Sequence, residues 1–553
     1  MNRAPRRYIL CALITAVNIA LSLGTMSCGD DAVVKAQGDL ELDRKAVDSD
    51  QPETYQDQPE VDQVQPDTDW DQLSDLWECP EWFKNAKFGL WMHWGPQTVP
   101  TKGGGWYARH MYLEPKELGE ETWGQEAWNY HREVYGHQSE FGYKDVCNLW
   151  RAENFDADST IAQFKKWGAR YVAIIANHCD NFDLFASSVH GWNTMNVGPG
   201  RDIVGEFSVA ARKHNLKWVA TVHSAWAPAY LGSAFGADSE GPWQGIPYDG
   251  YLTREDGIGT WWEGLDPQQL YASQYEAFEE ELAQRHLELV INYQPDLLFL
   301  DAYQIPEPMK KACATLFANS LKQHGTIQTI VTVRDPQIGT IQEYEKGVTE
   351  GLQQKYWQTD TTIADDWFFK PKPDGTSNMR HNARSLKELL VDIVSKRGAL
   401  LLNLAVHADG TIPQDQAKEM DEFGYWLKGN GEAIYGTRPW KIYGEGGGEV
   451  AGEFKERGIT STPWGQNVLR FTRDKSNTAL YVHVFGAPAD DEIVVRSFAP
   501  KEGLFNSVIL QVSVIGSDNW IVWSLQEDGL HVDMPSELAF KDCNVIKIAT
   551  TGL

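Results

Sequence analysis

The chain has 553 residues, with 49 lysines and arginines, 78 aspartates and glutamates, and a formal net charge of −29. This length predicts two or three structural units rather than one domain. The acidic balance argues against nucleic acid or an anionic membrane surface as a partner. The 23 tryptophans are compatible with sugar rings stacking on indoles, although a tryptophan-rich core accounts for many of them equally well.

The first 28 residues have the pattern of an export signal. Arg3, Arg6 and Arg7 precede an apolar run over residues 9–23, and a small-residue segment then leads to Cys28. We expect either acylation of Cys28 after cleavage, as in bacterial lipoproteins, or simple signal cleavage. The apolar run is short for a permanent membrane span. The protein is therefore predicted to be exported, periplasmic or at the cell surface, with any membrane attachment made through Cys28.

Residues 29–75 are rich in aspartate, glutamine and proline and have few aliphatic side chains. Such a segment cannot bury enough apolar surface to offset the entropy cost of ordering, so we predict a disordered acidic tether. The cysteines beyond the signal show no CxxC pattern, which argues against zinc-ribbon and redox motifs. At most two disulfides could form among these five cysteines, and none is needed to explain the fold.

Residues 76–436 show alternating strand and helix patterns. Predicted strands cover residues 88–93, 171–176, 218–223, 297–301, 328–333 and 400–404. Predicted helices cover residues 159–167, capped by Asp158, residues 202–214, and residues 385–396, ending before Gly398. This alternation predicts a parallel sheet in an α/β fold, and the length favours a (β/α)8-like TIM barrel. An open doubly wound sheet is the alternative, but no glycine-rich phosphate loop follows the first strand.

The pattern changes at residue 437. β-rich runs cover residues 467–472, 479–484, 492–497, 508–514, 520–525 and 545–549. Turn residues separate these runs, which predicts an antiparallel β-sandwich over residues 437–553. Such a domain often only packs on its catalytic neighbour, and sugar binding is the less favoured alternative.

Polar residues that close the predicted barrel strands are candidates for chemistry, because barrel active sites lie at the C-terminal ends of strands. Asp301 is the strongest of them. A carboxylate that ends an apolar run must face the barrel mouth or be buried at a high cost, and it could attack an anomeric carbon. Capping of the next helix, or pairing with a neighbouring arginine, explains its position equally well.

Three histidines, His93, His178 and His223, each close or follow a predicted strand, and Asp180 lies two residues after His178. Histidine beside tryptophan suits a sugar, which offers hydroxyl groups and an apolar face. The three histidines could also be metal ligands, but HxH and HExxH spacings are absent from the sequence, so we expect no metal.

The sequence resembles the glycoside hydrolase family 29 α-L-fucosidases. Residues 82–95 read WFKNAKFGLWMHWG, close to the family pattern WFxxAKFGxFxHWG. Matching segments follow in the same order at residues 167–171, 201–206, 293–296, 389–396, 400–403, 409–413 and 430–440. The resemblance covers about residues 77–440.

This resemblance implies a (β/α) barrel with a C-terminal β-sandwich and metal-free, cofactor-free retaining hydrolysis of terminal α-L-fucose from glycans or polysaccharides. It places the nucleophile at Asp301. The general acid/base falls in a variable loop at residues 339–347, where we prefer Glu345 to Glu343. The sugar contacts that we expect are His93, Trp94, Trp106, His178, Asp180, His223, Phe299, Arg334 and Trp367.

Several positions depart from the family pattern. The second histidine of HHDGF is Cys179, the glycine of that motif is Asn181, and a tyrosine after the third strand is replaced by His223. Such changes can redirect sugar specificity, so L-galactose or another fucose-like sugar is an alternative to fucose. A catalytically inactive carbohydrate-binding protein and a metal-dependent hydrolase are the rival functions, and the oligomeric state stays open.

Overall fold

The computed structural model describes residues 69–115, 122–447, 464, 468–486 and 492–553. The predicted signal peptide, Cys28 and the predicted tether up to residue 68 lie outside the described residues. None of the helices in the described part is long and apolar enough to cross a membrane.

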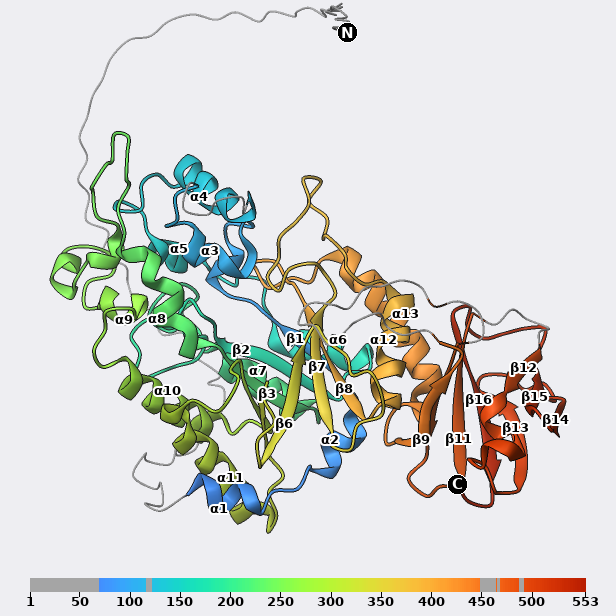
Figure 1. Ribbon diagram of the computed structural model, residues 1–553. Coiled ribbons are helices and arrows are strands. Elements are labelled where there is room, and N and C mark those ends of the chain that lie inside the picture. Colours follow the sequence, from blue (N-terminus) through green and yellow to red (C-terminus); the bar gives the residue numbers. More distant parts are fainter. Residues whose placement is uncertain (1–68, 116–121, 448–463, 465–467, 487–491) are drawn as a thin grey trace, which may run out of the picture. The chain divides into compact units, whose positions relative to one another are not determined.

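Eight parallel strands form a closed barrel in the order β1-β2-β3-β4-β5-β6-β7-β8, and β1 pairs with β8 to close it (Figure 1). They are β1 Phe88–Met92, β2 Tyr171–Asn177, β3 Lys217–Val222, β4 Leu297–Leu300, β5 Ile330–Val333, β6 Thr340–Glu345, β7 Trp357–Thr362 and β8 Gly398–Leu404. Most of these strands are buried along their full length, because helices cover one face and side chains fill the other. The predicted TIM barrel is confirmed.

Helices surround and extend this barrel. The α-helices are α1 Trp70–Asp75, α2 Glu81–Ala86, α3 Tyr107–His110, α4 Thr122–Val134, α5 Tyr143–Leu149, α6 Ala157–Lys166, α7 Ile203–Lys213, α8 Ala227–Tyr230, α9 Pro267–Tyr271, α10 Phe278–Tyr293, α11 Lys310–His324, α12 Ala383–Ser395 and α13 Gln414–Asn430. The 3-10 helices are η2 Pro96–Thr98, η3 Gly104–Trp106, η4 Ser224–Trp226, η5 Leu231–Phe235, η6 Asp249–Tyr251, η7 Arg254–Gly257, η8 Glu307–Met309, η9 Gly431–Ala433, η10 Arg496–Phe498 and η11 Pro500–Glu502.

Two helix ends and one segment differ from the sequence prediction. Asp156, not Asp158, caps α6, because its carboxylate accepts the backbone N–H of Ser159 at 2.7 Å. Gly398 is the first residue of β8 rather than a helix cap. Helix α1 lies in the segment that we predicted as tether: Trp70 packs on Phe317 of α11 with ring centroids 5.0 Å apart. This burial places residues 70–75 with the folded part of the chain.

Strands β6 and β7 were not predicted, and β6 occupies most of residues 339–347, where we expected a variable loop. Their sequences, TIQEYE and WQTDTT, contain no apolar run. Their side chains nevertheless line a packed barrel, and no helix lies in the described links from β5 to β6 and from β6 to β7. Both strands therefore place polar groups in the interior.

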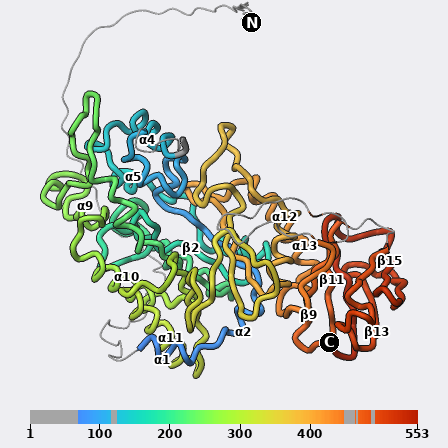
Figure 2. Tube along the Cα trace, in the orientation of Figure 1, coloured from blue at the N-terminus to red at the C-terminus, as the bar shows by residue number. Residues whose placement is uncertain are grey.

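The C-terminal part forms two antiparallel sheets, ordered β13-β16-β11-β10-β9 and β12-β15-β14. The strands are β9 Arg438–Glu445, β10 Val468–Arg473, β11 Ala479–Phe485, β12 Glu492–Val495, β13 Ile509–Val514, β14 Trp523–Gln526, β15 Gly529–Asp533 and β16 Cys543–Thr550. One core contains residues of both sheets, such as Val482 and Val532, which confirms the sandwich. Figure 2 shows the trace of this part of the chain in orange to red. Strands β9 and β15 were not predicted.

Candidate active site

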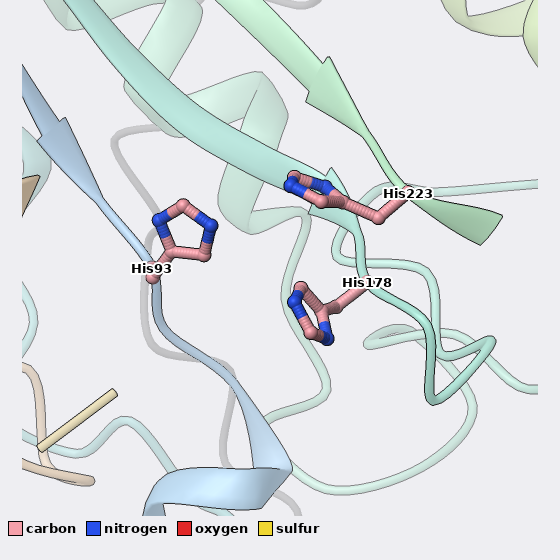
Figure 3. A group of neighbouring side chains, drawn as sticks. All are labelled: His93, His178 and His223. Carbon is pink, nitrogen blue, oxygen red and sulfur yellow. The ribbon is translucent and has the colours of Figure 1, made fainter. Parts of the chain in front are cut away.

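Three histidines converge at the C-terminal ends of the first three barrel strands (Figure 3). His93 follows β1, His178 follows β2 and His223 follows β3. Their ring centroids are 5.8 Å apart for His93 and His178, 5.3 Å for His93 and His223, and 4.8 Å for His178 and His223. The structure thus brings together the three histidines that the sequence suggested.

Hydrogen bonds behind two of these rings assign the same tautomer. Asn403 Oδ1 accepts the backbone N–H of His93 at 2.7 Å, while its Nδ2 donates to the carbonyl of Trp367 at 2.8 Å. This fixes the amide, so His93 Nδ1, at 3.3 Å from the same oxygen, is the donor. His223 Nδ1 likewise donates to the carbonyl of Asn177 at 3.3 Å. The Nε2 atoms of His93 and His223 therefore keep a lone pair.

His178 has the opposite tautomer. Gln97 Oε1 accepts from the Tyr230 hydroxyl at 2.8 Å and from the backbone N–H of Ala108 at 3.3 Å, which leaves Gln97 Nε2 as the donor to His178 Nδ1 at 3.0 Å. The proton of the His178 ring is therefore on Nε2. Together the three rings offer two acceptors and one donor.

All three imidazoles are held in the neutral form. Burial lowers the pKa values of His93 and His178 well below the ordinary value, and in both cases the neighbouring His223 adds to the effect. Burial also lowers the pKa of His223 to about 3. Near neutral pH the cluster has no charge, so it can pair with hydroxyl groups without attracting an anion.

The same cluster is a candidate cation site, because the ligand atoms of its members lie within 4.8 Å of one another. Zinc needs an unprotonated nitrogen from each histidine at about 2.0–2.1 Å. Donation from Gln97 to His178 instead leaves a proton on the His178 nitrogen opposite that bond. The arrangement therefore suits sugar hydroxyls better than a metal ion.

Charged residues gather after β4, β5 and β6. Asp301 follows β4, and its backbone N–H bonds the carbonyl of Val222 at 3.1 Å. Arg334 follows β5 and donates from Nη2 both to Asp301 Oδ1, at 2.6 Å, and to Glu345 Oε2, at 2.8 Å. Both carboxylates are partly accessible, with side chains 16% and 22% exposed.

The shared guanidinium nitrogen limits the distance between Asp301 and Glu345. Because Asp301 Oδ1 and Glu345 Oε2 contact the same atom, at 2.6 and 2.8 Å, they cannot be farther apart than the sum of these distances. That limit falls within the separation of about 5–5.5 Å used by retaining glycosidases and below the roughly 6.5–9.5 Å of inverting ones.

Burial and Arg334 shift the pKa of Asp301 in opposite directions. Burial raises the pKa of the Asp301 carboxyl, while the positive charge and hydrogen bond of Arg334 lower it, and the net direction is upward. The two carboxylates conversely raise the pKa of Arg334 despite its burial, so the guanidinium stays charged. The bridge thus supplies the charge that favours an ionised Asp301 in a buried position.

Glu343 and Asp360 form a second, buried acid pair. Their side chains hydrogen-bond to each other, and no other hydrogen bond of either carboxyl group is found in the part of the chain that the structure describes. A carboxylate only accepts, so the shared bond requires a proton. Burial raises the pKa of both carboxyl groups, that of Asp360 to about 8. The charge of Glu345 adds to the effect at Asp360, and the charge of Asp360 adds to the effect at Glu343. Glu343 is only 3% exposed, which makes Glu345 the better placed acid/base candidate.

Aromatic rings line the histidine cluster. The buried ring of Phe299 lies 6.1 Å from that of His223 at an interplanar angle of 29°. Trp367 lies with its ring centroid 4.8 Å from His93, and the ammonium group of Lys346 is 4.5 Å from the Trp367 centroid. Phe299 and Trp367 therefore lie where the sequence analysis expected them.

Two predicted sugar contacts are not in the pocket. Trp94 is fully buried, donates to the carbonyl of His407 at 2.8 Å and packs on Trp150 and Phe155, so it is a core residue. Asp180 is also buried and accepts the hydroxyl of Tyr143, with burial raising its pKa to about 6. The carboxylate of Asp180 is therefore used within the protein interior.

Trp106 lies next to Gly105, which adjoins the histidine cluster. It is 43% exposed and its ring lies 5.5 Å from that of Tyr230. Its neighbour Gly105 is close enough to the cluster that an added Cβ would lie 3.6 Å from His178 Cε1. A sugar bound against the histidines could therefore reach this indole.

Sequence reasoning missed several residues that contact the predicted site residues. They are Gln97, Asn177, Asn403, Trp226, Tyr303 and Asp360. Asn403 did carry a signal, because it is a polar residue inside the apolar strand that ends at Leu404. Asp360 had none, since β7 is polar throughout.

A family model, curated proteins and solved structures of α-L-fucosidases all match this chain. The family described as Alpha-L-fucosidase matches residues 54–432, more than half of the chain. The α-L-fucosidase of Dictyostelium discoideum is 26% identical over 443 residues, which cover 77% of this chain and 82% of that protein. Human tissue α-L-fucosidase is 27% identical over 471 residues, covering 82% and 85%. The crystal structure of Thermotoga maritima α-fucosidase in complex with fucose matches with a TM-score of 0.62 and 26% identity, covering 87% of this chain and 100% of that chain.

Proposed function

This chain belongs to the α-L-fucosidase family, and we propose that it is an exo-acting glycoside hydrolase that releases terminal α-L-fucose with retention of configuration. One observation carries the proposal: Arg334 bridges Asp301 and Glu345, and thereby keeps the two carboxylates closer together than those of an inverting glycosidase, as a retaining mechanism requires. The bridge comes from three successive strand ends at the barrel mouth, where barrel enzymes have their active sites.

The reaction has two steps. Asp301 Oδ attacks the anomeric carbon while the protonated carboxyl of Glu345 gives its proton to the departing glycosidic oxygen, which leaves as the alcohol. The resulting fucosyl ester is then attacked by water, whose proton passes to Glu345 as the bond to Asp301 breaks. Free fucose leaves, and both carboxyl groups return to their starting forms.

The histidine cluster supports recognition of a neutral sugar. The Nε2–H of His178 is a donor for a hydroxyl oxygen, and Nε2 of His93 and of His223 are acceptors for hydroxyl protons. Cys179 lies near Asp301, whose charge together with burial raises the thiol pKa, so the thiol is neutral. His223 and Cys179 are the positions that we expect to favour fucose or shift preference toward a related sugar such as L-galactose.

Hydrolysis of aryl glycosides tests this proposal. The protein without residues 1–28, which keeps helix α1, is assayed with aryl α-L-fucoside, aryl L-galactoside and a panel of other aryl glycosides, beside Asp301→Asn. We expect wild type to hydrolyse the fucoside and Asp301→Asn to lose at least about 10³-fold in kcat. Turnover of a different sugar would contradict fucose as the substrate, and full activity of Asp301→Asn would contradict the nucleophile.

We also propose that the protein is exported and that Cys28 carries a lipid. The support is the sequence alone: an arginine-rich start, an apolar run and a small-residue segment that ends at Cys28. Metabolic labelling with an alkyne fatty acid in a bacterial host tests it. Label on wild type and its loss in Cys28→Ser support acylation, whereas an unlabelled, exported wild type supports simple cleavage.

A further inference from the structure

Two aromatic side chains beside the proposed nucleophile are exposed. Trp226, at the end of η4, is 39% exposed, and Tyr303, two residues after Asp301, is 48% exposed. The largest fully buried side chains of the described residues include eight other tryptophans. Apolar rings that stay in water next to a reaction centre leave surface available for a ligand.

Both aromatic residues are fixed in place. The indole N–H of Trp226 donates to the backbone carbonyl of Asp301, and the backbone N–H of Asp335 donates to the carbonyl of Tyr303 at 2.8 Å. Their rings form an edge-to-face pair with centroids 6.4 Å apart at 81°. Because a hydrogen bond already holds the Trp226 indole, a ligand that packs on this ring loses little additional conformational entropy there.

The pair lies beside the arginine that joins the two carboxylates. The guanidinium carbon of Arg334 is 5.7 Å from the centroid of the Tyr303 ring, and Arg334 Nη2 bonds Glu345 at 2.8 Å. The oxygen that leaves the fucose must contact Glu345, so the group attached to that oxygen lies near the Arg334 bridge, which Tyr303 adjoins. The buried histidine cluster, by contrast, provides the pocket for the fucose itself.

We propose that Trp226 and Tyr303 form a subsite for the aglycone, in which they pack against the apolar face of a pyranose ring linked to the departing oxygen. This inference rests on the proposed fucosidase function and deepens it. A pyranose presents C–H groups on one face, and aromatic rings bind such surfaces favourably. The substrate class that fits is a fucosylated oligosaccharide rather than a fucoside with a small alkyl group.

Two kinds of substrate that differ only in the leaving group test the subsite. The first kind is a set of α-L-fucosyl disaccharides, and the second is α-L-fucosyl fluoride, which has no aglycone ring. For Trp226→Ala we expect the loss of kcat/KM on the best disaccharide to exceed the loss on the fluoride by about tenfold, the value of one aromatic contact. Tyr303→Ala should show the same selective loss without removing the bond to the Asp301 carbonyl.

Two control variants separate the ring from its hydrogen bond and from general effects. Trp226→Phe keeps a ring but loses the indole N–H, and it should keep most of the preference for disaccharides. Trp520→Ala removes a tryptophan that is 92% exposed in the sandwich, and it should leave the ratio of the two activities at the wild-type value.

The outcomes that overturn the subsite are distinct from failure of the proposed function. Equal losses on both substrates in Trp226→Ala and Tyr303→Ala would mean that these residues only position Asp301, which overturns the subsite alone. Disaccharide activity that does not fall also overturns it. A wild-type protein that hydrolyses neither substrate overturns both the fucosidase function and the subsite.

Discussion

The mouth of the barrel has two unlike halves. The histidine half, formed by His93, His178 and His223 after β1 to β3, is buried and uncharged. The carboxyl half, formed by Asp301, Glu343, Glu345 and Asp360 on or after β4, β6 and β7, surrounds a single bridging arginine.

The difference shows how one pocket can bind a neutral sugar and still cleave it. Hydroxyl groups need donors and acceptors in fixed directions, and neutral imidazoles with assigned tautomers provide these without the cost of burying a charge. Cleavage of the glycosidic bond develops charge, which requires a nucleophile and a proton donor. In the proposed mechanism the carboxyl half provides both, with Arg334 as the counter-charge.

Substituting glutamine for each glutamate of β6 in turn is expected to give the largest difference in activity between two variants. Glu345→Gln removes the proton donor, so kcat/KM for a fucosyl disaccharide should fall by about 10²–10⁴-fold. Glu343→Gln keeps a buried hydrogen-bonding group next to Asp360 and should cost less than about tenfold. Steady-state kinetics on purified variants with matching circular dichroism spectra provide the comparison, and a larger loss in Glu343→Gln would reverse our assignment.

Removal of the bridging charge should move the acid limb of the pH profile. Arg334 lowers the pKa of Asp301, so in Arg334→Gln this pKa rises further. Asp301 must be ionised to attack, so the acid limb of kcat/KM should shift to higher pH by about 1–3 units. Arg334→Lys retains the charge and should keep the limb near its wild-type position. An acid limb that does not shift in Arg334→Gln would show that Arg334 does not set the pKa of Asp301.

The buried acid pair predicts a pH-dependent stability. Burial raises the pKa of Asp360 from 3.8 to about 8, so the folded state keeps a proton that the unfolded chain has lost. Wild-type stability therefore falls as the pH rises from about 4 to 8. Asparagine cannot ionise, so the free energy of unfolding of Asp360→Asn relative to wild type should increase over this window, by about 1.4 kcal/mol for each pH unit.

Denaturant unfolding at pH 5 and pH 8 measures that difference. Asp533→Asn, a change at an exposed aspartate of the sandwich, is the matched control and should show no such trend. A constant difference between Asp360→Asn and wild type at the two pH values would show that the pair holds no extra proton.

Chelation should have the smallest effect. If the histidine half binds sugar hydroxyls, dialysis against EDTA or 1,10-phenanthroline should leave fucosidase activity unchanged. If chelation abolished activity and zinc restored it, the three imidazoles would be a metal site. The histidine half would then not be an uncharged sugar-binding half.

The sequence identified the histidine half more completely than the carboxyl half. The histidine strands β1 to β3 are apolar runs that end in a polar residue, a pattern that follows directly from burial of a parallel sheet. Asp301 and Arg334 could be found in the same way. Strands β6 and β7 could not, because they place catalytic and proton-sharing groups inside the barrel and so lack an apolar run.

Tryptophans show a second limit of sequence reasoning. Trp94 and Trp106 both lie close to the first barrel strand, yet one is fully buried and the other is 43% exposed. An indole suits a core and a sugar platform equally well, so only the packing against Trp150 and Phe155 separates the two roles. The same holds for Trp226, whose position beside Asp301 depends on a contact between two loops.

Covalent trapping tests the central claim most directly. The protein is incubated with 2-deoxy-2-fluoro-α-L-fucosyl fluoride, which slows breakdown of a fucosyl-enzyme ester more than its formation, and is then digested and analysed by mass spectrometry. We predict one added fluorofucosyl group on the peptide that contains Asp301, and none in Asp301→Asn. A label on another residue, or rapid hydrolysis of fucosides with inversion and without any label, would contradict a double displacement at Asp301.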